Sequence, residues 1–398
     1  MTRNVVLATV NALSLYLHIP FCDVCCTYCA FNIYTKAQAL IPAYVAAMCH
    51  ELEGLGQSTA EPIETVYFGG GTPSLLAPEQ VARIMQTCRR AFAIAPTAEI
   101  TLEANPESID TGYLEQLRNI GVNRLSIGMQ SAQADELRLF ARQHDADAVP
   151  HAVQAARSAG FDNVSLDLIY GAPHQTLDSW RASAEAALAL TPDHLSLYAL
   201  ILEPGTALVR SIERGWLPVP DDDLAADMYE LADELVSAAG LAQYEISTWA
   251  RPGAMCQHNL HYWHNLPYLG VGAGAHGYAG GLRYEVVRSL QRYIDVASQQ
   301  TEPLPFPLTP TVEHTDLIDE RESMAEHMIT GLRLLNEGVN LTVFEQRFGV
   351  PLDHIYGSVL DQLVAYDLLY CDHNSLKLTR RARLISNQVF MRFMPDRE

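Results

Sequence analysis

His18-Ile19-Pro20-Phe21-Cys22-Asp23-Val24-Cys25-Cys26-Thr27-Tyr28-Cys29 is the segment of this sequence that says most about its fold. Its cysteines at positions 22, 26 and 29 follow the spacing Cys-x3-Cys-x2-Cys, which supplies three thiolates from one loop. A cubane iron–sulfur cluster has four irons and usually takes four cysteines. Three protein ligands leave one iron open to bind a substrate, so the spacing predicts a substrate-binding [4Fe-4S] cluster.

Cys25 leaves other interpretations open. The run also divides into the pairs Cys22/Cys25 and Cys26/Cys29, as in structural zinc sites, although zinc pairs are normally far apart in the sequence. Cys25 could also replace Cys26 in the cluster triplet. A disulfide framework is disfavoured, because eight cysteines in 398 residues is a low density. We expect the scattered cysteines to be buried small side chains: Cys49, Cys88, Cys256 and Cys371.

Composition bounds the class of protein. The 398 residues are 48% hydrophobic, and a parallel βα barrel needs roughly 250 residues, so we expect at least one further domain. The formal net charge of −21 disfavours nucleic acid as a partner. Residues 375–398 are locally basic, and we expect either a solvated helix face or peripheral contact with an anionic membrane. No apolar run approaches the ~20 residues needed to span a bilayer, which with reduced thiols favours the cytoplasm.

Strand and helix patterns alternate in the first half of the chain. Each strand-like run is rich in Val, Ile, Leu or Tyr and precedes a helical pattern. The predicted strands are 14–19, 63–68, 98–103, 123–128, 162–169 and 193–199, and the predicted helices are 36–55, 78–92, 110–119, 147–159 and 177–190. Repeated βα units give a parallel sheet with right-handed crossovers. Six units predict an α/β fold with a partial (β/α)6 barrel, and an open doubly wound sheet is the alternative.

The pattern changes after residue 205. A helix is predicted over 222–239, a strand over 244–249, a Gly-rich loop over 269–277 and a Pro-rich linker over 301–310. Helices at 320–335, 341–348 and 353–366, a hairpin at 367–378 and a last helix at 380–392 suggest a smaller, mostly α, winged-helix-like domain. We therefore divide the chain into a barrel core (1–215), a barrel-extending segment (216–305) and a C-terminal domain (306–398).

Polar residues gather where the predicted strands end, which is where the active sites of βα barrels form. The turn Gly69-Gly70-Gly71-Thr72-Pro73 follows the second strand, and its glycines allow close approach to a ligand. Tyr16 and His18 alternate on the first strand, so both can face the barrel mouth. The other candidates are Glu103 and Asn105 at the end of the third strand, Gln130 after the fourth, Arg142 in the helical region beyond it, and Asp167 near the end of the fifth. A carboxylate suits ribose hydroxyls, and a guanidinium suits a carboxylate.

Together these segments resemble radical-SAM proteins related to oxygen-independent coproporphyrinogen III dehydrogenase. Beyond the cysteine segment, the resemblance covers Gly69–Ser74, Leu102–Pro106, Arg124–Ser131, Asp167–Gly171, His194–Tyr198 and Glu203–Thr206. It implies that Cys22, Cys26 and Cys29 ligate the [4Fe-4S] cluster and that S-adenosylmethionine (SAM) is chelated at the open iron. It further implies that Gly70 and Thr72 contact the methionyl part of SAM. Tyr16, Glu103, Gln130, Arg142 and Asp167 are the remaining SAM contacts by resemblance.

Three features place the chain in one branch of that family. Phe31 stands where the dehydrogenase branch usually carries a fourth cysteine, and the segment before the first predicted strand is short. His258-Asn259-Leu260-His261-Tyr262-Trp263 is similar to the His-Asn-x-x-Tyr-Trp signature of the HemW heme chaperones. This resemblance implies heme binding near His258, Tyr262 and Trp263. It also implies delivery of heme to hemoproteins, and we expect the recipients to be those of the respiratory chain. His261, His264 and His276 are rival iron ligands, and packing in the lower barrel is the other role open to His258.

The resemblance therefore predicts a heme chaperone on a radical-SAM scaffold. The alternative is an enzyme that decarboxylates coproporphyrinogen III, and SAM cleavage is open in either case. A DNA-binding regulator is disfavoured, because the stretch 353–366 carries Asp353 and Asp361 but no Lys or Arg. An exposed cluster loop could also couple the assembly of a homodimer to cluster content.

Overall fold

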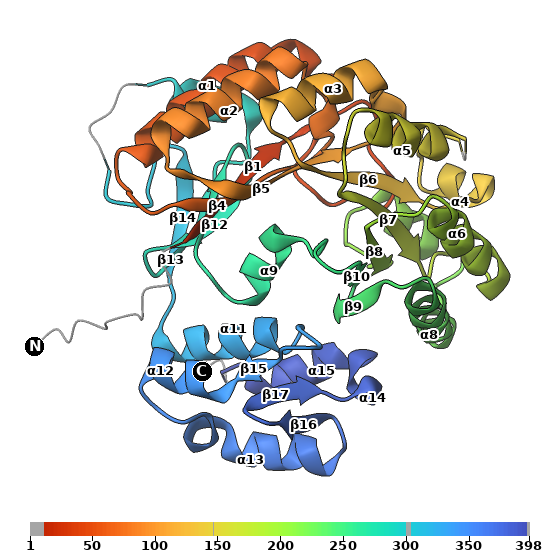
Figure 1. The fold of residues 1–398 in the computed structure, drawn as a ribbon. Helices are drawn as coiled ribbons and strands as arrows, with labels where there is room; N and C mark the ends of the chain where they lie inside the picture. Colours follow the sequence, from red (N-terminus) through yellow and green to blue (C-terminus); the bar gives the residue numbers. More distant parts are fainter. Residues whose placement is uncertain (1–11, 146, 300–303, 396–398) are drawn as a thin grey trace, which may run out of the picture.

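A long curved sheet forms the centre of the protein, which is described here from a computed structural model (Figure 1). Within the residues that the structure describes (12–145, 147–299 and 304–395), twelve strands form this sheet, in the order β14-β13-β12-β11-β1-β4-β5-β6-β7-β8-β10-β9. The middle seven pair in parallel: β11 (Tyr268–Val271), β1 (Leu13–Ile19), β4 (Ile63–Gly70), β5 (Ile94–Ala104), β6 (Arg124–Gln130), β7 (Val164–Tyr170) and β8 (His194–Ala199). All six strands predicted for the barrel core are confirmed.

Antiparallel strands end the sheet on both sides. One side carries β12 (His276–Ala279), β13 (Leu282–Val286) and β14 (Val312–Leu317), and the other carries β10 (Thr248–Ala250) and β9 (Ala242–Glu245). The two end strands do not pair with each other, so the predicted incomplete barrel is confirmed. The strand predicted over 244–249 is wrong in detail, because the chain turns at 246–247 and forms a hairpin of two short strands.

The prediction of a continuous loop over 269–277 (the Gly-rich segment) is also wrong. Its beginning belongs to β11 and its end to β12, with a turn between them. A Cβ atom on Gly270 would lie 1.9 Å from the carbonyl oxygen of His276. Glycine is therefore required here for the two strands to approach. The glycines of 269–277, which suggest a loop in the sequence, belong to a tight connection between two strands.

Helices cover the outer, convex face of the sheet (Figure 1). They are α1 (Ile41–Gly56), α2 (Pro78–Ala91), α3 (Thr111–Ile120), α5 (Ala148–Ser158), α6 (Leu177–Ala189) and α8 (Asp222–Ala238). Local signals account for their ends. Pro78 occupies the first turn of α2, the Asp110 carboxylate caps α3 by accepting from the Tyr113 N–H at 2.8 Å, and Gly121 ends α3 with a φ of 111°. These predicted helices are confirmed.

Shorter elements escaped prediction because they span too few residues for a periodic pattern. They are α4 (Ala134–Leu139), α7 (Ala207–Glu213), α9 (Gln257–Trp263), α10 (Leu290–Ala297), β2 (Phe21–Cys22), β3 (Tyr34–Thr35) and the 3-10 turns η1 (Gln38–Leu40), η2 (Pro73–Leu75) and η3 (Pro106–Ser108). Helix α9 differs from the rest, since it lies on the inner, concave side of the sheet (Figure 1).

The C-terminal module has a hydrophobic core of its own, with Met328, Phe344 and Phe393 among its most buried side chains. Its elements are α11 (Glu320–Gly331), β15 (Val339–Asn340), α12 (Leu341–Phe348), α13 (Leu352–Ala365), β16 (Leu369–Asp372), β17 (Ser375–Leu378), α14 (Arg380–Arg383), α15 (Ser386–Phe390) and the 3-10 turn η4 (Met391–Phe393). Three strands in the order β15-β17-β16 pack with the helices, as expected for a winged-helix-like domain. The last helix predicted over 380–392 is broken, because Ile385 leaves the helical conformation.

The C-terminal module faces the concave side of the barrel, with α9 between them (Figure 1). The guanidinium of Arg333 lies 4.3 Å from the centre of the Trp263 ring, and His264 Nε2 lies 2.8 Å from Glu337 Oε2. The basic C-terminal segment contributes as well, since Arg380 pairs with Glu230 and Asp233 of α8. Part of the positive charge of this segment is therefore neutralised by ion pairs within the protein. Arg397 lies outside the described residues, and membrane contact stays a prediction.

None of the described helices combines the length and the apolar character needed to cross a membrane.

Candidate cofactor site at the barrel mouth

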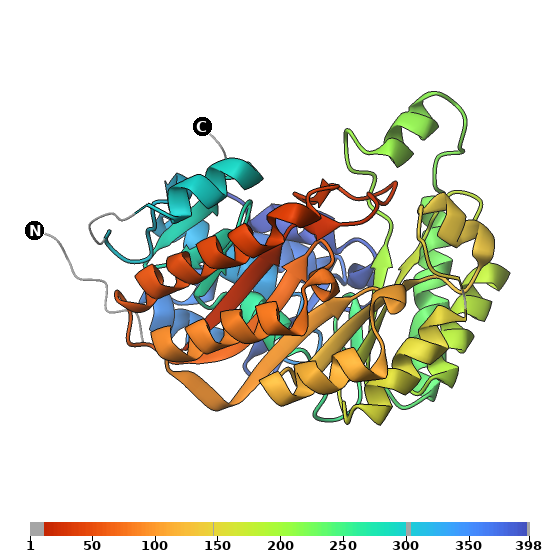
Figure 2. The ribbon, with the colours of Figure 1, turned by 90° about the horizontal axis from the view of Figure 1, so that it is seen from above.

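The cluster loop (residues 20–33) connects β1 to β3 at the carboxyl ends of the parallel strands. Phe21 anchors its start, because its buried ring packs edge-on against Tyr44 with 5.2 Å between ring centres. Thr27 anchors its middle. The Thr27 hydroxyl donates to the Leu139 carbonyl at 2.7 Å, and the Thr27 carbonyl accepts from the Leu208 N–H at 2.8 Å. The loop and α7 thus lie at the same end of the barrel (Figure 2).

The cysteines of this loop differ in burial. Cys22 is buried, Cys26 and Cys29 are half-buried, and Cys25 is exposed. Burial raises the pKa of both the Cys22 and Cys29 thiols to about 11, so metal binding at these sites displaces protons. Among the described residues, no three Cys, His, Asp or Glu side chains converge as the ligands of a single metal ion would. The triplet of Cys22, Cys26 and Cys29 stays a prediction.

The scattered cysteines confirm expectation at three positions of four. Cys49, Cys88 and Cys256 are buried, but Cys371 is exposed. Cys371 lies on β16, an edge strand of the small C-terminal sheet, and its side chain points away from the core. Position on an edge strand, which the sequence does not reveal, explains this wrong prediction.

The glycine turn after β4 lies directly against the cluster loop. Gly71 N–H donates to the Ile19 carbonyl at 2.9 Å, and Thr72 N–H donates to the Phe21 carbonyl at 2.8 Å. A Cβ atom on Gly71 would lie 2.6 Å from the Phe21 carbonyl oxygen and 3.0 Å from Cys22 Sγ. Only glycine therefore fits between these atoms. The Thr72 hydroxyl lies 3.5 Å from Cys22 Sγ, so the second strand end contacts a predicted cluster ligand.

Arg142 joins the cluster loop to the ends of β5 and β6. Its Nη1 lies 3.8 Å from Cys26 Sγ, and its Nη2 donates to Asn105 Oδ1 at 2.8 Å and to the Gly128 carbonyl at 3.0 Å. Its buried Nε has no hydrogen-bond partner within the described part of the chain. A buried donor without an acceptor costs free energy, so Arg142 is prepared to donate to a bound carboxylate.

Two buried carboxylates follow along the sheet. Glu103 accepts from the Tyr67 hydroxyl at 2.8 Å and from the Gly70 N–H at 3.1 Å, and burial raises its pKa to about 7. Asp167 accepts from the Ser126 hydroxyl at 2.9 Å, and burial raises its pKa as well. The sequence did not predict a role for Tyr67, although its place on β4, two residues before the glycine turn begins at Gly69, was a possible signal.

Gln130 ends β6 in a left-handed conformation, with a φ of 61°. The pairing of β6 with β7 shifts register between Gly128 and Gln130, so a bulge terminates the strand there. A Cβ atom on Gly128 would lie 2.7 Å from the Gln130 side-chain nitrogen and 3.2 Å from Arg142 Nη2. The glycine thus leaves space that both polar side chains border.

Tyr16 and His18 complete the mouth from β1. The Asn32 carbonyl accepts from His18 Nε2–H at 2.9 Å, so His18 Nδ1 accepts the Tyr16 hydroxyl at 3.1 Å. Burial raises the pKa of Tyr16 and lowers that of His18, so both are neutral at pH 7. The Asn32 amide also donates to the carbonyls of Ala273 and Arg288, at 2.9 and 3.0 Å. Nothing in the sequence pointed to Asn32.

The motif at 258–263 lies on α9, below the strand ends. His258 is buried and stacks on Tyr67, with 4.8 Å between ring centres. Its Nδ1 lies 2.6 Å from the Thr65 hydroxyl and its Nε2 lies 2.9 Å from the Tyr262 hydroxyl. Trp263 faces the C-terminal module through Arg333 instead. The motif therefore connects the barrel interior to the module, and its role toward heme stays a prediction.

A cavity of about 300 Å³ opens beside the cluster loop. Its lining includes Tyr16, His18, Phe31, Tyr262, His276 and Arg288. Two residues of β1, Tyr16 and His18, and one residue of the α9 motif, Tyr262, thus border a common space.

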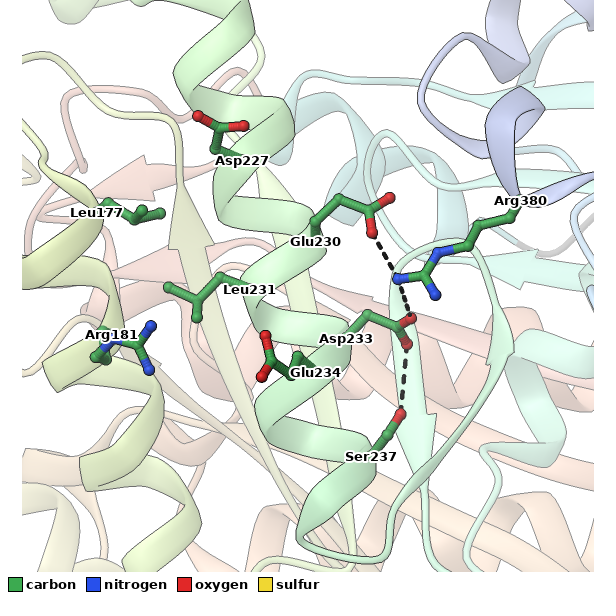
Figure 3. Close-up of a pocket in the computed structure, with 9 residues that line it drawn as sticks. All are labelled: Leu177, Arg181, Asp227, Glu230, Leu231, Asp233, Glu234, Ser237 and Arg380. Atoms are coloured by element: carbon green, nitrogen blue, oxygen red, sulfur yellow. Dashed lines mark hydrogen bonds and ion pairs between the residues drawn. The ribbon is translucent and has the colours of Figure 1, made fainter.

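A larger open cavity, of about 690 Å³, lies between α6, α8 and α14 (Figure 3). Four carboxylates are among its lining residues, and Arg380 reaches two of them, Glu230 at 2.5 Å and Asp233 at 3.4 Å. This cavity lies among the outer helices and contains none of the predicted site residues. It is better described as part of the contact between barrel and module.

The donor set at the mouth fits the predicted cofactors. Thiols are the ligands that iron–sulfur clusters take, and the cluster loop presents them beside a glycine turn with no room for a side chain. Arg142 supplies a cation 3.8 Å from Cys26 Sγ, and Glu103 supplies a buried carboxylate that accepts from the Gly70 N–H of the glycine turn. SAM carries a carboxylate and an ammonium group on one carbon, so a cationic and an anionic side chain match the two groups of its amino acid end.

Comparisons with known proteins agree with this geometry. A family described as "Radical SAM superfamily" matches residues 16–187, and one described as "HemN C-terminal domain" matches residues 318–385. The heme chaperone HemW of Bacillus subtilis is 37% identical over 96% of this chain and 99% of its own. HemW of Mycobacterium tuberculosis is 44% identical over 73% of this chain and 75% of its own.

Among solved structures, the radical SAM enzyme coproporphyrinogen III oxidase (HemN) from Escherichia coli aligns with a TM-score of 0.82. It is 25% identical, and the alignment covers 96% of this chain and 89% of that one. Membership of the radical SAM superfamily implies a [4Fe-4S] cluster and SAM as cofactors. With a relative 37% identical along almost its whole length, the chain belongs to the HemW family of heme chaperones, on a radical SAM scaffold.

Proposed function

We propose that this protein binds heme and transfers it to recipient hemoproteins, and that its barrel mouth holds a [4Fe-4S] cluster and SAM. The observation that carries the proposal is the match to HemW chaperones, at 33% and 37% identity over 96% of the chain and at 44% identity over 73% of it. The α9 motif supports it, because Tyr262 borders the same cavity as Tyr16 and His18. Respiratory hemoproteins are the recipients that we expect.

Within this proposal, Cys22, Cys26 and Cys29 hold the cluster and leave one iron open. A bound cluster supplies one-electron reducing power and a chelation point for the amino acid end of SAM. Arg142 donates to the SAM carboxylate, since its buried Nε–H has no partner among the described residues. Gly70 and Thr72 border the methionyl part, and Glu103, Gln130 and Asp167 provide the polar wall.

The cluster requires reduced thiols, which favours a reducing compartment such as the cytoplasm. Burial already keeps the Cys22 and Cys29 thiols protonated at neutral pH. Cluster assembly therefore releases protons and becomes more favourable as the pH rises.

The test is heme transfer by the anaerobically reconstituted protein. We expect a Soret band to develop when the protein is titrated with heme. After an apo-hemoprotein is added and the two proteins are separated by size, the Soret absorbance should be found with the apo-hemoprotein. In a second assay, coproporphyrinogen III is incubated with the same sample in the presence of SAM and a reductant. Turnover to protoporphyrinogen without heme transfer would replace the chaperone proposal with the decarboxylase alternative.

A further inference from the structure

The cavity beside the cluster loop is lined by four side chains of the kinds that bind a metalloporphyrin. Phe31 and Tyr262 offer aromatic surfaces, His276 offers an imidazole, and Arg288 offers a guanidinium. Phe31 is 71% exposed, which is unusual for a phenylalanine and places a large apolar ring at the cavity rim. A porphyrin is a flat apolar ring with two carboxylates at one edge, so this combination matches its surface.

The candidate histidines differ in whether a ring nitrogen is available to iron. The Thr65 hydroxyl donates to Ser14 Oγ at 2.7 Å, so it accepts from His258 Nδ1–H. His258 Nε2 therefore carries the lone pair, and the Tyr262 hydroxyl donates to it at 2.9 Å. Because iron binds that same lone pair, ligation by the buried His258 would break this hydrogen bond and open the barrel interior.

The neighbouring histidines are occupied as well. His261 is buried, and its Nε2 lies 3.1 Å from the Pro267 carbonyl oxygen. His264 Nε2 lies 2.8 Å from Glu337 of the C-terminal module. These nitrogens hold the turn after α9 and the module contact, so neither histidine is prepared for a ligand.

His276 differs from these three. Its side chain is 57% exposed, and its nearest acidic atom, Glu285 Oε1, lies 3.9 Å from its Nε2, beyond hydrogen-bond distance. It begins β12 at the rim of the cavity. Its imidazole can therefore reach an iron placed at the cavity without breaking a buried contact.

Arg288 is anchored at the same rim by its backbone. Its carbonyl accepts from the Asn32 amide at 3.0 Å and from the Tyr34 hydroxyl at 2.8 Å. Its side chain is exposed and forms no ion pair with any described residue. An exposed guanidinium on a fixed backbone suits bidentate recognition of a carboxylate.

We propose that this cavity binds the edge of a metalloporphyrin, with His276 as an axial iron ligand and Arg288 paired to a propionate. His258 is then a positioning residue, which fixes the hydroxyl of the cavity residue Tyr262. The inference rests on the proposed heme binding and names the residues that carry it. It also assigns the α9 motif an indirect part.

The experiment is a titration of holo-protein, loaded with its cluster, with ferric heme under anaerobic conditions. The variants are His276→Gly and His258→Ala, and the matched control is His354→Ala, an exposed histidine on α13. We expect His276→Gly to shift the Soret band and weaken heme binding at least tenfold, and added imidazole to restore the band position. His258→Ala should retain the wild-type band position with weaker binding, and His354→Ala should match the wild type.

A second arm tests the carboxylate contact. Arg288→Gln should weaken binding of heme but leave binding of heme dimethyl ester, which lacks propionate charges, at its wild-type affinity. An unchanged Soret band and affinity in His276→Gly, or a ligand change in His258→Ala, would overturn the inference while heme binding itself stands. No heme binding by the wild type would instead remove the proposed function.

Discussion

Removing Cys25 and Cys26 one at a time tests which thiol completes the cluster triplet. Cys25 is exposed, and its Sγ makes one long contact, 3.6 Å to the Cys26 carbonyl oxygen. Its replacement by alanine should therefore change the free energy of unfolding by no more than about 0.5 kcal/mol. Cys26 is half-buried, and its Sγ faces Arg142 Nη1 at 3.8 Å, on the side of the loop that meets the strand ends.

We expect Cys25→Ala to retain about four irons per chain after anaerobic reconstitution, as a cubane requires. Cys26→Ala should lose the cluster and with it the iron that chelates SAM. Its SAM affinity should fall at least tenfold, which corresponds to about 1.4 kcal/mol of binding free energy. Iron content, the EPR signal of the reduced cluster and equilibrium dialysis with SAM provide three independent measurements.

Cys371→Ala is the matched control, because Cys371 is exposed and lies on the C-terminal module. It should behave as the wild type in all three measurements. If Cys25→Ala lost its iron while Cys26→Ala kept it, the triplet would be Cys22, Cys25 and Cys29, and the role assigned to Arg142 would have to be revised.

Three further perturbations follow from the geometry. The buried Glu103 has a pKa of about 7, and a bound cation favours its ionised form. The SAM affinity of the wild type should therefore fall about tenfold per pH unit well below pH 7 and level off above it. Glu103→Gln should bind SAM more weakly and without this dependence between pH 6 and 8, as measured by equilibrium dialysis. Gly71→Ala places a Cβ atom 2.6 Å from the Phe21 carbonyl oxygen, so it should lower the unfolding free energy by about 1–3 kcal/mol and reduce iron content, by urea titration and iron assay. In the wild type, the buried Glu245 carboxylate lies 3.1 Å from Arg333 Nη2. Arg333→Gln removes this partner and should lower the unfolding free energy by about 3 kcal/mol, as measured by urea titration.

Each of these outcomes has a clear opposite. A pH profile for SAM that is unchanged in Glu103→Gln would mean that another group titrates. Full iron content and wild-type stability in Gly71→Ala would show that the glycine turn can move away from the cluster loop. Arg333→Gln with wild-type stability would mean that water or another side chain compensates Glu245.

The barrel core could be predicted because its signals are local. Six Val-, Ile- and Leu-rich runs are buried on both faces, and prolines and glycines mark the helix ends, as Pro78 and Gly121 do. Glu103 and Gln130 then follow from one rule, since parallel strands end at the same edge. Tyr16 and Asp167 instead lie in the middle of β1 and β7, so the expected place of Asp167 near a strand end was wrong. The connection between Gly270 and His276 broke the pattern, because a glycine needed for close strand approach looks like a loop glycine.

Contacts between distant segments were beyond prediction. No local pattern identifies Arg288 as a partner of the cluster loop, because 256 positions separate it from Asn32. No local pattern identifies Trp263 as a partner of Arg333 either, because this contact forms only when the C-terminal module folds back onto the barrel. The resemblance supplied the α9 motif, but it could not tell that His258 is held on both ring nitrogens. The choice among histidines depends on such tertiary detail.

Asn32 links the cluster loop to the rim of the neighbouring cavity. It lies three positions after Cys29, and it hydrogen-bonds with His18, Ala273 and Arg288. Whatever fixes the metal-binding loop thus also fixes the rim on which cargo would rest. The placement of the cluster ligands and the placement of the cargo rim are therefore coupled through one amide side chain.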